Sequence, residues 1–242
     1  MKQDIPWNRF GVEAIVIVAS ILFAFAIDAW WESRQERYEE LRLLRNLQSD
    51  FIATRNLLDQ ELPRHESFKR SALLVAEYAV SEHSLPEPEM FKDVGVLIRL
   101  FITSVSSYPI TGALDGALAS GNLEIIQNDR LRGLLAGWPR TIQEFREQEL
   151  ATRSITTEAL SVLVGNAGVA IDLLAFTGFA DDLSSRVPKE VSDEFIQFIK
   201  SPVGQNYLVL KAISEARAVN DGETLMNSVE EILQLINQEL GI

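Results

Sequence analysis

The feature that most constrains this chain is an apolar run without a single charge over residues 14–27, bounded by Glu13 and Asp28. Two tryptophans, Trp30 and Trp31, follow the run, and a long stretch without proline or glycine follows them. This order indicates one long helix that begins apolar and becomes polar. Tryptophans beside an apolar helix are typical of a membrane–water interface.

The length of the run fits a membrane span only if its two carboxylates lie at opposite ends. A span needs roughly 20 predominantly apolar residues, and residues 10–31 supply them. Glu13 and Asp28 lie roughly 22 Å apart along a helix, so each reaches its own interface, where a charge costs far less than at the bilayer centre. We therefore predict a membrane anchor within residues 1–31. Its interface residues are Glu13, Asp28, Trp30 and Trp31.

Two other interpretations of the run stay open. Lys2 and Arg9, followed by a short apolar core and the small residues Ala24 and Ala26, resemble a cleavable secretory signal. The run is also compatible with a buried core helix.

The side of the membrane on which the domain lies is a separate question. Arginines after the run favour a cytoplasmic domain by the positive-inside rule, whereas long domains are exported largely regardless of charge. We expect a periplasmic domain.

Composition excludes several functions for the rest of the chain. Among 242 residues, Asp and Glu number 35 and Lys and Arg number 22, which gives a net charge of −13. A surface this acidic repels the phosphates of nucleic acids, so we predict no nucleic-acid partner. The absence of cysteine removes disulfides, thiolate catalysis and cysteine metal sites.

The pattern after the run predicts an all-α fold. The stalk, residues 32–62, carries apolar residues at the spacing of one helix face; these are Leu44, Leu47, Phe51 and Leu58. A stripe this wide favours packing within the same chain, with a coiled coil between subunits as the alternative. We expect Pro63 to end or kink the stalk helix. The predicted architecture is a transmembrane helix continuous with a long stalk helix, packed into a multi-helix bundle domain over residues 32–242.

Further helices are expected in that domain. Two of them cover residues 66–80 and 89–104, and a short one runs from a Thr111 cap to Gly121. A long helix is expected after a cap at Asn128 or Asp129, with a kink at Pro139. A last helix is opened by Ser201-Pro202 and runs to Leu240. The apolar stretch 159–180 is interrupted by glycines. We expect it to be a buried helix–turn–helix or a loop on the core rather than a second span.

No motif for catalysis, metal binding or phosphate binding stands out. The two histidines, His65 and His83, form neither of the metal-binding pairs known from helical proteins, and we predict both at the surface. We therefore predict no enzymatic activity, no cofactor and no metal. Glu13 is a functional candidate, because an ionisable residue in a span often marks an ion or proton path.

Three segments carry a resemblance to known proteins. The first is residues 12–34, in which the apolar run ends with the motif Ile27-Asp28-Ala-Trp30. The second is residues 118–132, which contain Ser120-Gly121-Asn-Leu-Glu-Ile-Ile126-Gln-Asn128. The third is residues 231–240, which end in Glu-Leu. Together they are similar to a bacterial family of single-pass membrane proteins catalogued as a domain of unknown function. Trp31 departs from that family, which often has Asn there. The resemblance implies a single-pass protein of the bacterial inner membrane with a helical domain, and it implies no activity.

These observations lead to three functional hypotheses. The first is a membrane-anchored helical interaction or scaffold protein that self-associates and binds an unidentified protein partner. The second is a ligand-binding sensor or accessory subunit that signals through the stalk, with the turn Ser120, Gly121 and Asn122 as a pocket wall or partner surface. The third is an oligomeric pore with Glu13 in the membrane core.

Overall fold

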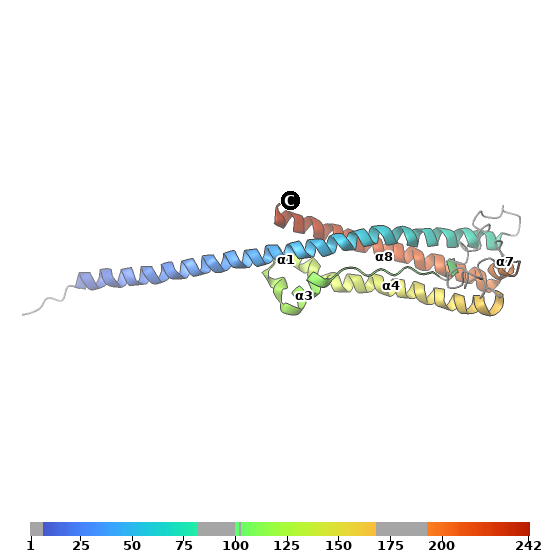
Figure 1. The fold of residues 1–242 in the computed structure, drawn as a ribbon, viewed down its shortest axis with the longest axis horizontal. Coiled ribbons are helices and arrows are strands. Elements are labelled where there is room, and N and C mark those ends of the chain that lie inside the picture. Colours follow the sequence, from blue (N-terminus) through green and yellow to red (C-terminus); the bar gives the residue numbers. More distant parts are fainter. Residues whose placement is uncertain (1–6, 82–99, 102, 168–192) are drawn as a thin grey trace, which may run out of the picture.

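A computed structural model shows the chain as a helical bundle from which one helix projects as a long arm (Figure 1). It describes residues 7–81, 100–101, 103–167 and 193–242. Side chains are described from Ile17 onward in the first helix, up to Val162 before the gap at 168–192, and from Phe195 after that gap. The elements are α1 (Trp7–Val80), α3 (Gly112–Ser120), the short 3-10 helix η2 (Asn122–Ile125), α4 (Asp129–Ala167), α7 (Asp193–Lys200) and α8 (Pro202–Leu240). In this part of the chain the all-α prediction is confirmed.

α1 and α8 form the long antiparallel pair of the bundle (Figure 1). Near the start of α8, Gln205 Nε2 donates to the carbonyl of Ala79 at 3.2 Å, and near its end Asn237 Oδ1 accepts from Gln48 Nε2 at 2.6 Å. α4 packs along α8 and runs in the same direction as α1. The stripe that begins in the stalk is therefore covered by helices of its own chain.

Two apolar clusters fill the bundle, one towards each end. The first joins the middle of α1 with α3, the first part of α4 and the last part of α8; its largest members are Phe51, Trp138 and Phe145. The second joins the end of α1 with α7 and the start of α8 around Phe101, Phe195 and Phe198. The predicted stalk stripe lies in the first cluster and packs there with one face of the last part of α8. Its residues Leu44, Leu47, Phe51 and Leu58, and the α8 residues Leu225, Val229, Ile232 and Ile236, are all buried.

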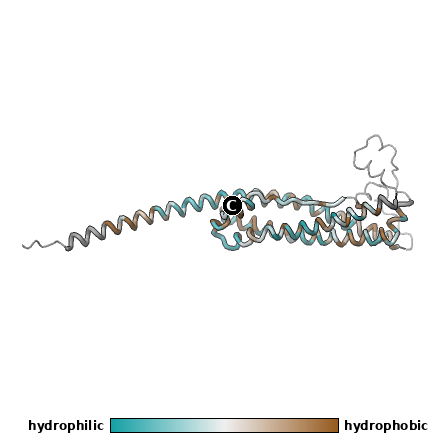
Figure 2. The backbone as a smooth tube through the Cα atoms, turned by 90° about the horizontal axis from the view of Figure 1, so that it is seen from below, coloured by the Kyte–Doolittle hydropathy of each residue, from teal (hydrophilic) through white to brown (hydrophobic). Residues whose placement is uncertain are grey.

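The first part of α1, residues 7–39, extends beyond the bundle and is called the arm below (Figure 2). Every described side chain from residue 17 to residue 36 is exposed, and Glu40 is the first buried one along α1. Apolar residues dominate the outer half of the arm and polar residues the half next to the bundle (Figure 2). Among the helices in the described ranges, none carries a stretch long and apolar enough to cross a membrane.

Pro63 does not end the stalk helix, so the prediction of separate helices before and after it is wrong. α1 continues through Pro63 to Val80. A proline inside a helix leaves the carbonyl four residues earlier without its donor, here that of Asp59. Both residues are exposed, so water can bond this carbonyl, while buried Leu58 and Val75 hold the helix to the bundle on either side.

The predicted caps are largely confirmed. Asn128 Oδ1 accepts from the Leu131 amide at 3.0 Å and opens α4, and Ser201 Oγ accepts from the Gly204 amide at 3.2 Å and opens α8. Gly121 closes α3 in the left-handed region with φ +75°. Thr111 occupies the cap position of α3 but makes no capping bond there. Of the expected helix over residues 89–104, residues 89–99 and 102 lie outside the described residues, residues 100–101 are helical, and residues 103–104 are not, so the expected end at 104 is wrong. Most of the stretch 159–180 and His83 also lie outside the described residues.

Gly204 gives a test of the packing at the start of α8. A Cβ at this position would lie 2.2 Å from the carbonyl oxygen of Phe198 and 2.7 Å from Cα of Ile199, which are backbone atoms that cannot turn aside. We expect Gly204→Ala to destabilise the bundle by on the order of 1–3 kcal/mol, measured by urea unfolding. The matched control is Gly133→Ala in α4, where nothing lies within 4 Å of an added Cβ; it should be neutral or stabilise by up to about 1 kcal/mol. Equal effects of the two substitutions would contradict the close approach.

Candidate functional site: a buried charged layer

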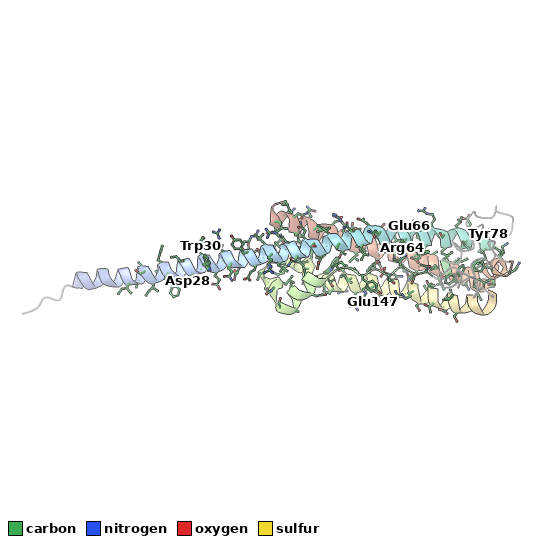
Figure 3. The ribbon with its side chains drawn as sticks, in the orientation of Figure 1. Asp28, Trp30, Arg64, Glu66, Tyr78 and Glu147 are labelled. Atoms are coloured by element: carbon green, nitrogen blue, oxygen red, sulfur yellow. The ribbon has the colours of Figure 1, made fainter. Side chains whose placement is uncertain are left out.

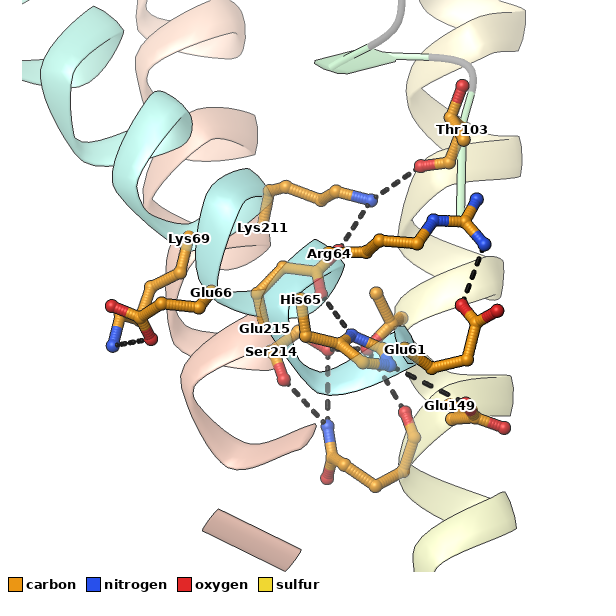
Figure 4. A network of polar contacts seen from close by, with 12 residues as sticks. Glu61, Arg64, His65, Glu66, Lys69, Thr103, Glu149, Lys211, Ser214 and Glu215 are labelled. Atoms are coloured by element: carbon orange, nitrogen blue, oxygen red, sulfur yellow. Dashed lines mark hydrogen bonds and ion pairs between the residues drawn. The ribbon is translucent and has the colours of Figure 1, made fainter. Parts of the chain in front are cut away.

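Four charged side chains lie buried between the two apolar clusters. His65 comes from α1, Glu149 from α4, and Lys211 and Glu215 from α8. All four are at most 4% exposed, and we call them the charged layer (Figure 4). Leaving a buried charge unpaired is far more costly than leaving a neutral polar group unpaired, so their partners decide whether the bundle is stable.

His65 lies between the two carboxylates of the charged layer. Its Nδ1 is 2.6 Å from Glu215 Oε2, and its Nε2 is 3.5 Å from Glu149 Oε1 (Figure 4). A neutral imidazole has one N–H, whereas the imidazolium has two. Only the protonated form therefore donates to both carboxylates at once, and the shorter contact with Glu215 is the stronger one.

Lys211 neutralises the other side of Glu215. Its Nζ lies 3.0 Å from Glu215 Oε1, and it donates to the Thr103 carbonyl at 3.0 Å and to Thr156 Oγ1 at 2.8 Å. Glu215 Oε1 forms this ion pair but accepts no hydrogen bond of good geometry from the described residues. The ammonium also lies 5.3 Å from the centre of the Phe68 ring. These contacts replace the water that the ammonium loses on burial.

Glu149 connects α4 to the extended segment before α3. Both of its carboxylate oxygens accept from the Ser107 amide at 2.9 Å, and Oε1 also accepts from Ser107 Oγ at 2.7 Å. Hydroxyl groups continue the polar layer towards α8, where Thr152 Oγ1 and Ser214 Oγ lie 2.6 Å apart. With His65 and Lys211 both charged, the two cations balance the two carboxylates of the layer.

The environment shifts the pKa values of the two cations in opposite directions. Burial lowers the pKa of His65, but hydrogen bonds and charge from Glu149 and Glu215 outweigh it, so the pKa lies above the usual 6.5. Burial lowers the pKa of Lys211 below its usual value, and Glu215 opposes this only in part. Burial raises the pKa of the neighbouring Tyr207 hydroxyl. The layer therefore holds an imidazolium more firmly than water does.

The chemistry open to the charged layer is proton binding and helix alignment. Among residues in the described ranges, no group of three or more His, Cys, Asp or Glu side chains is placed to hold a metal ion. A buried ion network is weak support for stability as such, but it can fix which helix faces meet. Here one imidazole joins α1 to α4 and α8 at the same level of the bundle.

A second polar junction lies where the arm leaves the bundle. Arg37 donates to Glu40 Oε2 at 2.5 Å and to the carbonyl of Glu239 at 3.0 Å. Glu40, fully buried, accepts from the Gln127 amide at 2.8 Å, and Asn128 Nδ2 donates to Glu239 Oε1 at 3.0 Å. We call these five residues the stalk-base junction. Two of the three segments that carry the family resemblance meet in it, beside the end of the first.

The residues predicted from the sequence as sites lie away from the charged layer. Asp28 and Trp30 are exposed on the arm (Figure 3), as is Trp31 next to them. The side chain of Glu13 lies outside the described ones. The turn of Ser120, Gly121 and Asn122 is exposed at the end of α3, with Ser120 Oγ donating to the Gly116 carbonyl at 2.8 Å. A partner or pocket role for this turn stays a prediction.

The prediction that His65 lies at the surface is wrong, because its side chain is fully buried. A signal for this exists in the sequence. His65 lies seven residues after Leu58 and seven before Ala72, both buried, and Glu215 lies seven after Leu208. The inward-facing stripe therefore continues through these polar residues. The expected helix end at Pro63 separated His65 from the stripe and led to the wrong prediction.

Comparisons with known proteins found no match: no family model, no curated protein and no solved structure corresponds to this chain. The resemblance in the three segments therefore stays a prediction. Any function of the chain is inferred from the geometry of the described residues.

The raised pKa of His65 predicts how stability depends on pH. Because the folded state holds this proton more tightly than the unfolded chain, the contribution of His65 is complete below pH 6.5 and is lost as pH rises through the raised value. The free energy of unfolding of the wild-type chain should therefore fall relative to that of His65→Gln across this window. Urea unfolding at a series of pH values above and below 6.5 measures it. A constant difference between the two chains would contradict the raised value, because it would mean that the pKa of His65 is the same in the folded and unfolded chains. A wild-type chain that gains stability relative to His65→Gln as pH rises would show that His65 is neutral in the fold.

Proposed function

We propose that this chain is a membrane-tethered helical interaction or scaffold protein, with the arm as a single-pass anchor and the bundle as a platform held close to the bilayer. The observation that carries the proposal is the arm itself. Its apolar side chains are exposed on every side of the helix, with Phe23 at 69% and Phe25 at 65%. Each such side chain gains about 1.5–3 kcal/mol on leaving water, so the arm needs an apolar environment.

The residues at the inner end of the arm suit an interface between lipid and water. The Arg34 guanidinium lies 5.4 Å from the centre of the Trp30 ring and 6.0 Å from that of Tyr38. Aromatic and arginine side chains of this kind favour the headgroup layer, where one end of the side chain is apolar and the other is wet. The proposed anchor uses residues 10–31, with Glu13 and Asp28 near opposite interfaces. We place the bundle on the periplasmic side.

The bundle supports a role in presenting a surface rather than in catalysis. Its core is closed by its own helices, and the stalk-base junction fixes the arm to the end of α8 and to the segment before α4. Self-association through the arm, or binding of a protein partner by the bundle, leaves this core intact. Lipid and protein are thus the partners that we propose.

A second candidate function is a sensor that signals through the stalk. It is favoured by the continuity of α1, which carries both the arm and His65. A change of charge in the buried layer would act on the helix that enters the proposed membrane segment. The pore with Glu13 in its lumen gains no support from the described side chains and stays a hypothesis.

Arginines placed in the apolar part of the arm test the tether. We expect Ile21→Arg combined with Phe25→Arg to release the chain from membranes, because each arginine near the bilayer centre costs about 2.5–3.5 kcal/mol. The matched control, Ser33→Arg with Gln35→Arg, adds the same charge beside the interface and should leave the chain attached. The measurement is the fraction that sediments with membranes after an alkaline wash. Release of the wild-type chain, or retention of the Ile21/Phe25 variant, would contradict the proposal.

A further inference from the structure

A small pocket lies between α4 and the segment that leads into α3. Its volume is about 210 Å³, below the roughly 300–1,000 Å³ typical of pockets for drug-sized ligands. The walls are about equally polar and apolar; the apolar part comes from Tyr108 and Leu114 on one side and from Trp138 and Ile142 of α4 on the other. The size and walls suit one ring or one branched aliphatic side chain.

Two side chains of opposite charge line the same pocket. The Arg146 guanidinium lies 5.6 Å from the centre of the Tyr108 ring, a cation–π contact that does not use its N–H donors. Asp115 accepts at Oδ2 from Thr111 Oγ1 at 2.7 Å, which holds the carboxylate in place. Arg146 and Asp115 are both exposed, and in the described residues neither forms an ion pair. The pocket therefore offers one cation and one anion beside the apolar part of its wall.

Trp138 adds a donor that the fold leaves unsatisfied. Its indole Nε1 is buried and has no hydrogen-bond partner in the part of the chain that is described. Such a donor is unfavourable when left unpaired, and most buried N–H groups have a partner. The Trp138 side chain also forms part of the pocket wall, so a ligand in the pocket would contact it.

We propose that this pocket binds a free α-amino acid with an apolar side chain. An α-amino acid carries a carboxylate and an ammonium on one carbon, which match Arg146 and Asp115, while its side chain enters the cavity against Trp138. An apolar acid without the ammonium leaves Asp115 unmatched, and an amine without the carboxylate leaves Arg146 unmatched. The proposal does not depend on the membrane tether, because all the lining residues belong to the bundle.

The test is isothermal titration of the full chain in detergent micelles with L-phenylalanine and L-leucine. Two analogues of phenylalanine separate the charges: 3-phenylpropanoate lacks the ammonium and phenethylamine lacks the carboxylate. We expect saturable binding of at least one amino acid at one site per chain, and binding of each analogue about tenfold weaker or more, since a hydrogen bond to a charged group contributes about that factor. Failure of both amino acids to bind would overturn the proposal, as would analogues that bind equally well.

Substitutions locate the binding. Arg146→Gln and Asp115→Asn should each weaken binding of the amino acid about tenfold. The control Arg130→Gln should leave it unchanged, because Arg130 lies outside the pocket at the start of α4, where it pairs with Glu231 of α8. Thermal unfolding of each variant shows that the bundle is intact. Equal losses in Arg146→Gln and Arg130→Gln would overturn the assignment to this pocket.

Discussion

The packing of α8 against the bundle half of α1 positions every other part of the molecule. α8 returns along α1 from the level of Ala79 to the level of Arg37, and α4 then packs along α8. α8 lies close to α1 and α4 at Gly222, where an added Cβ would lie 2.2 Å from Leu62 Cδ2 and 3.1 Å from Phe145 Cε2. Because α1 continues beyond this pairing without a break, the direction of the arm is set by the bundle.

The charged layer explains how this pairing keeps its alignment. Leucine and phenylalanine side chains in the two apolar clusters pack well at more than one alignment of neighbouring helices, since dispersion and burial are not directional. The contact of His65 with Glu215 at 2.6 Å is directional and joins α1 to α8, so a shift of one helix turn between these helices would break it and leave the imidazolium in the core without this partner. We infer that the layer contributes more to specifying the arrangement than to net stability.

Much of the fold follows from local sequence signals, whereas the site depends on contacts between distant residues. The stripe from Leu44 to Leu58, the Asn128 and Ser201 caps and the glycine turn at Gly121 depend on neighbours a few residues away, so they were predictable. Pro63 misled because its local cost is offset by packing on both sides of it. The pairing of His65 with Glu215 spans 150 positions, and no local pattern shows which carboxylate meets which cation.

The sequence also shows why the two ends of the molecule differ. The apolar run predicts an anchor, which stays a prediction, and the described side chains of the run, from Ile17, lie on the arm outside the bundle. An all-helical pattern contains no information on what the bundle binds. The pocket beside Arg146 illustrates this: its walls come from two segments that meet only through the fold. Function in such a chain has to be inferred from side chains brought together by packing.

The distance between Ser33 on the arm and Ser67 in the bundle tests directly whether α1 is one continuous helix. The chain contains no cysteine, so cysteines introduced at these two exposed positions can carry spin labels without competing sites. Electron–electron double resonance of the full chain in lipid nanodiscs should give one narrow distribution centred near roughly 51 Å, from a rise of about 1.5 Å per residue. A broad distribution, or one centred well below this distance, would show that the helix breaks at Pro63 or at the stalk-base junction, and would contradict a rigid link between arm and bundle.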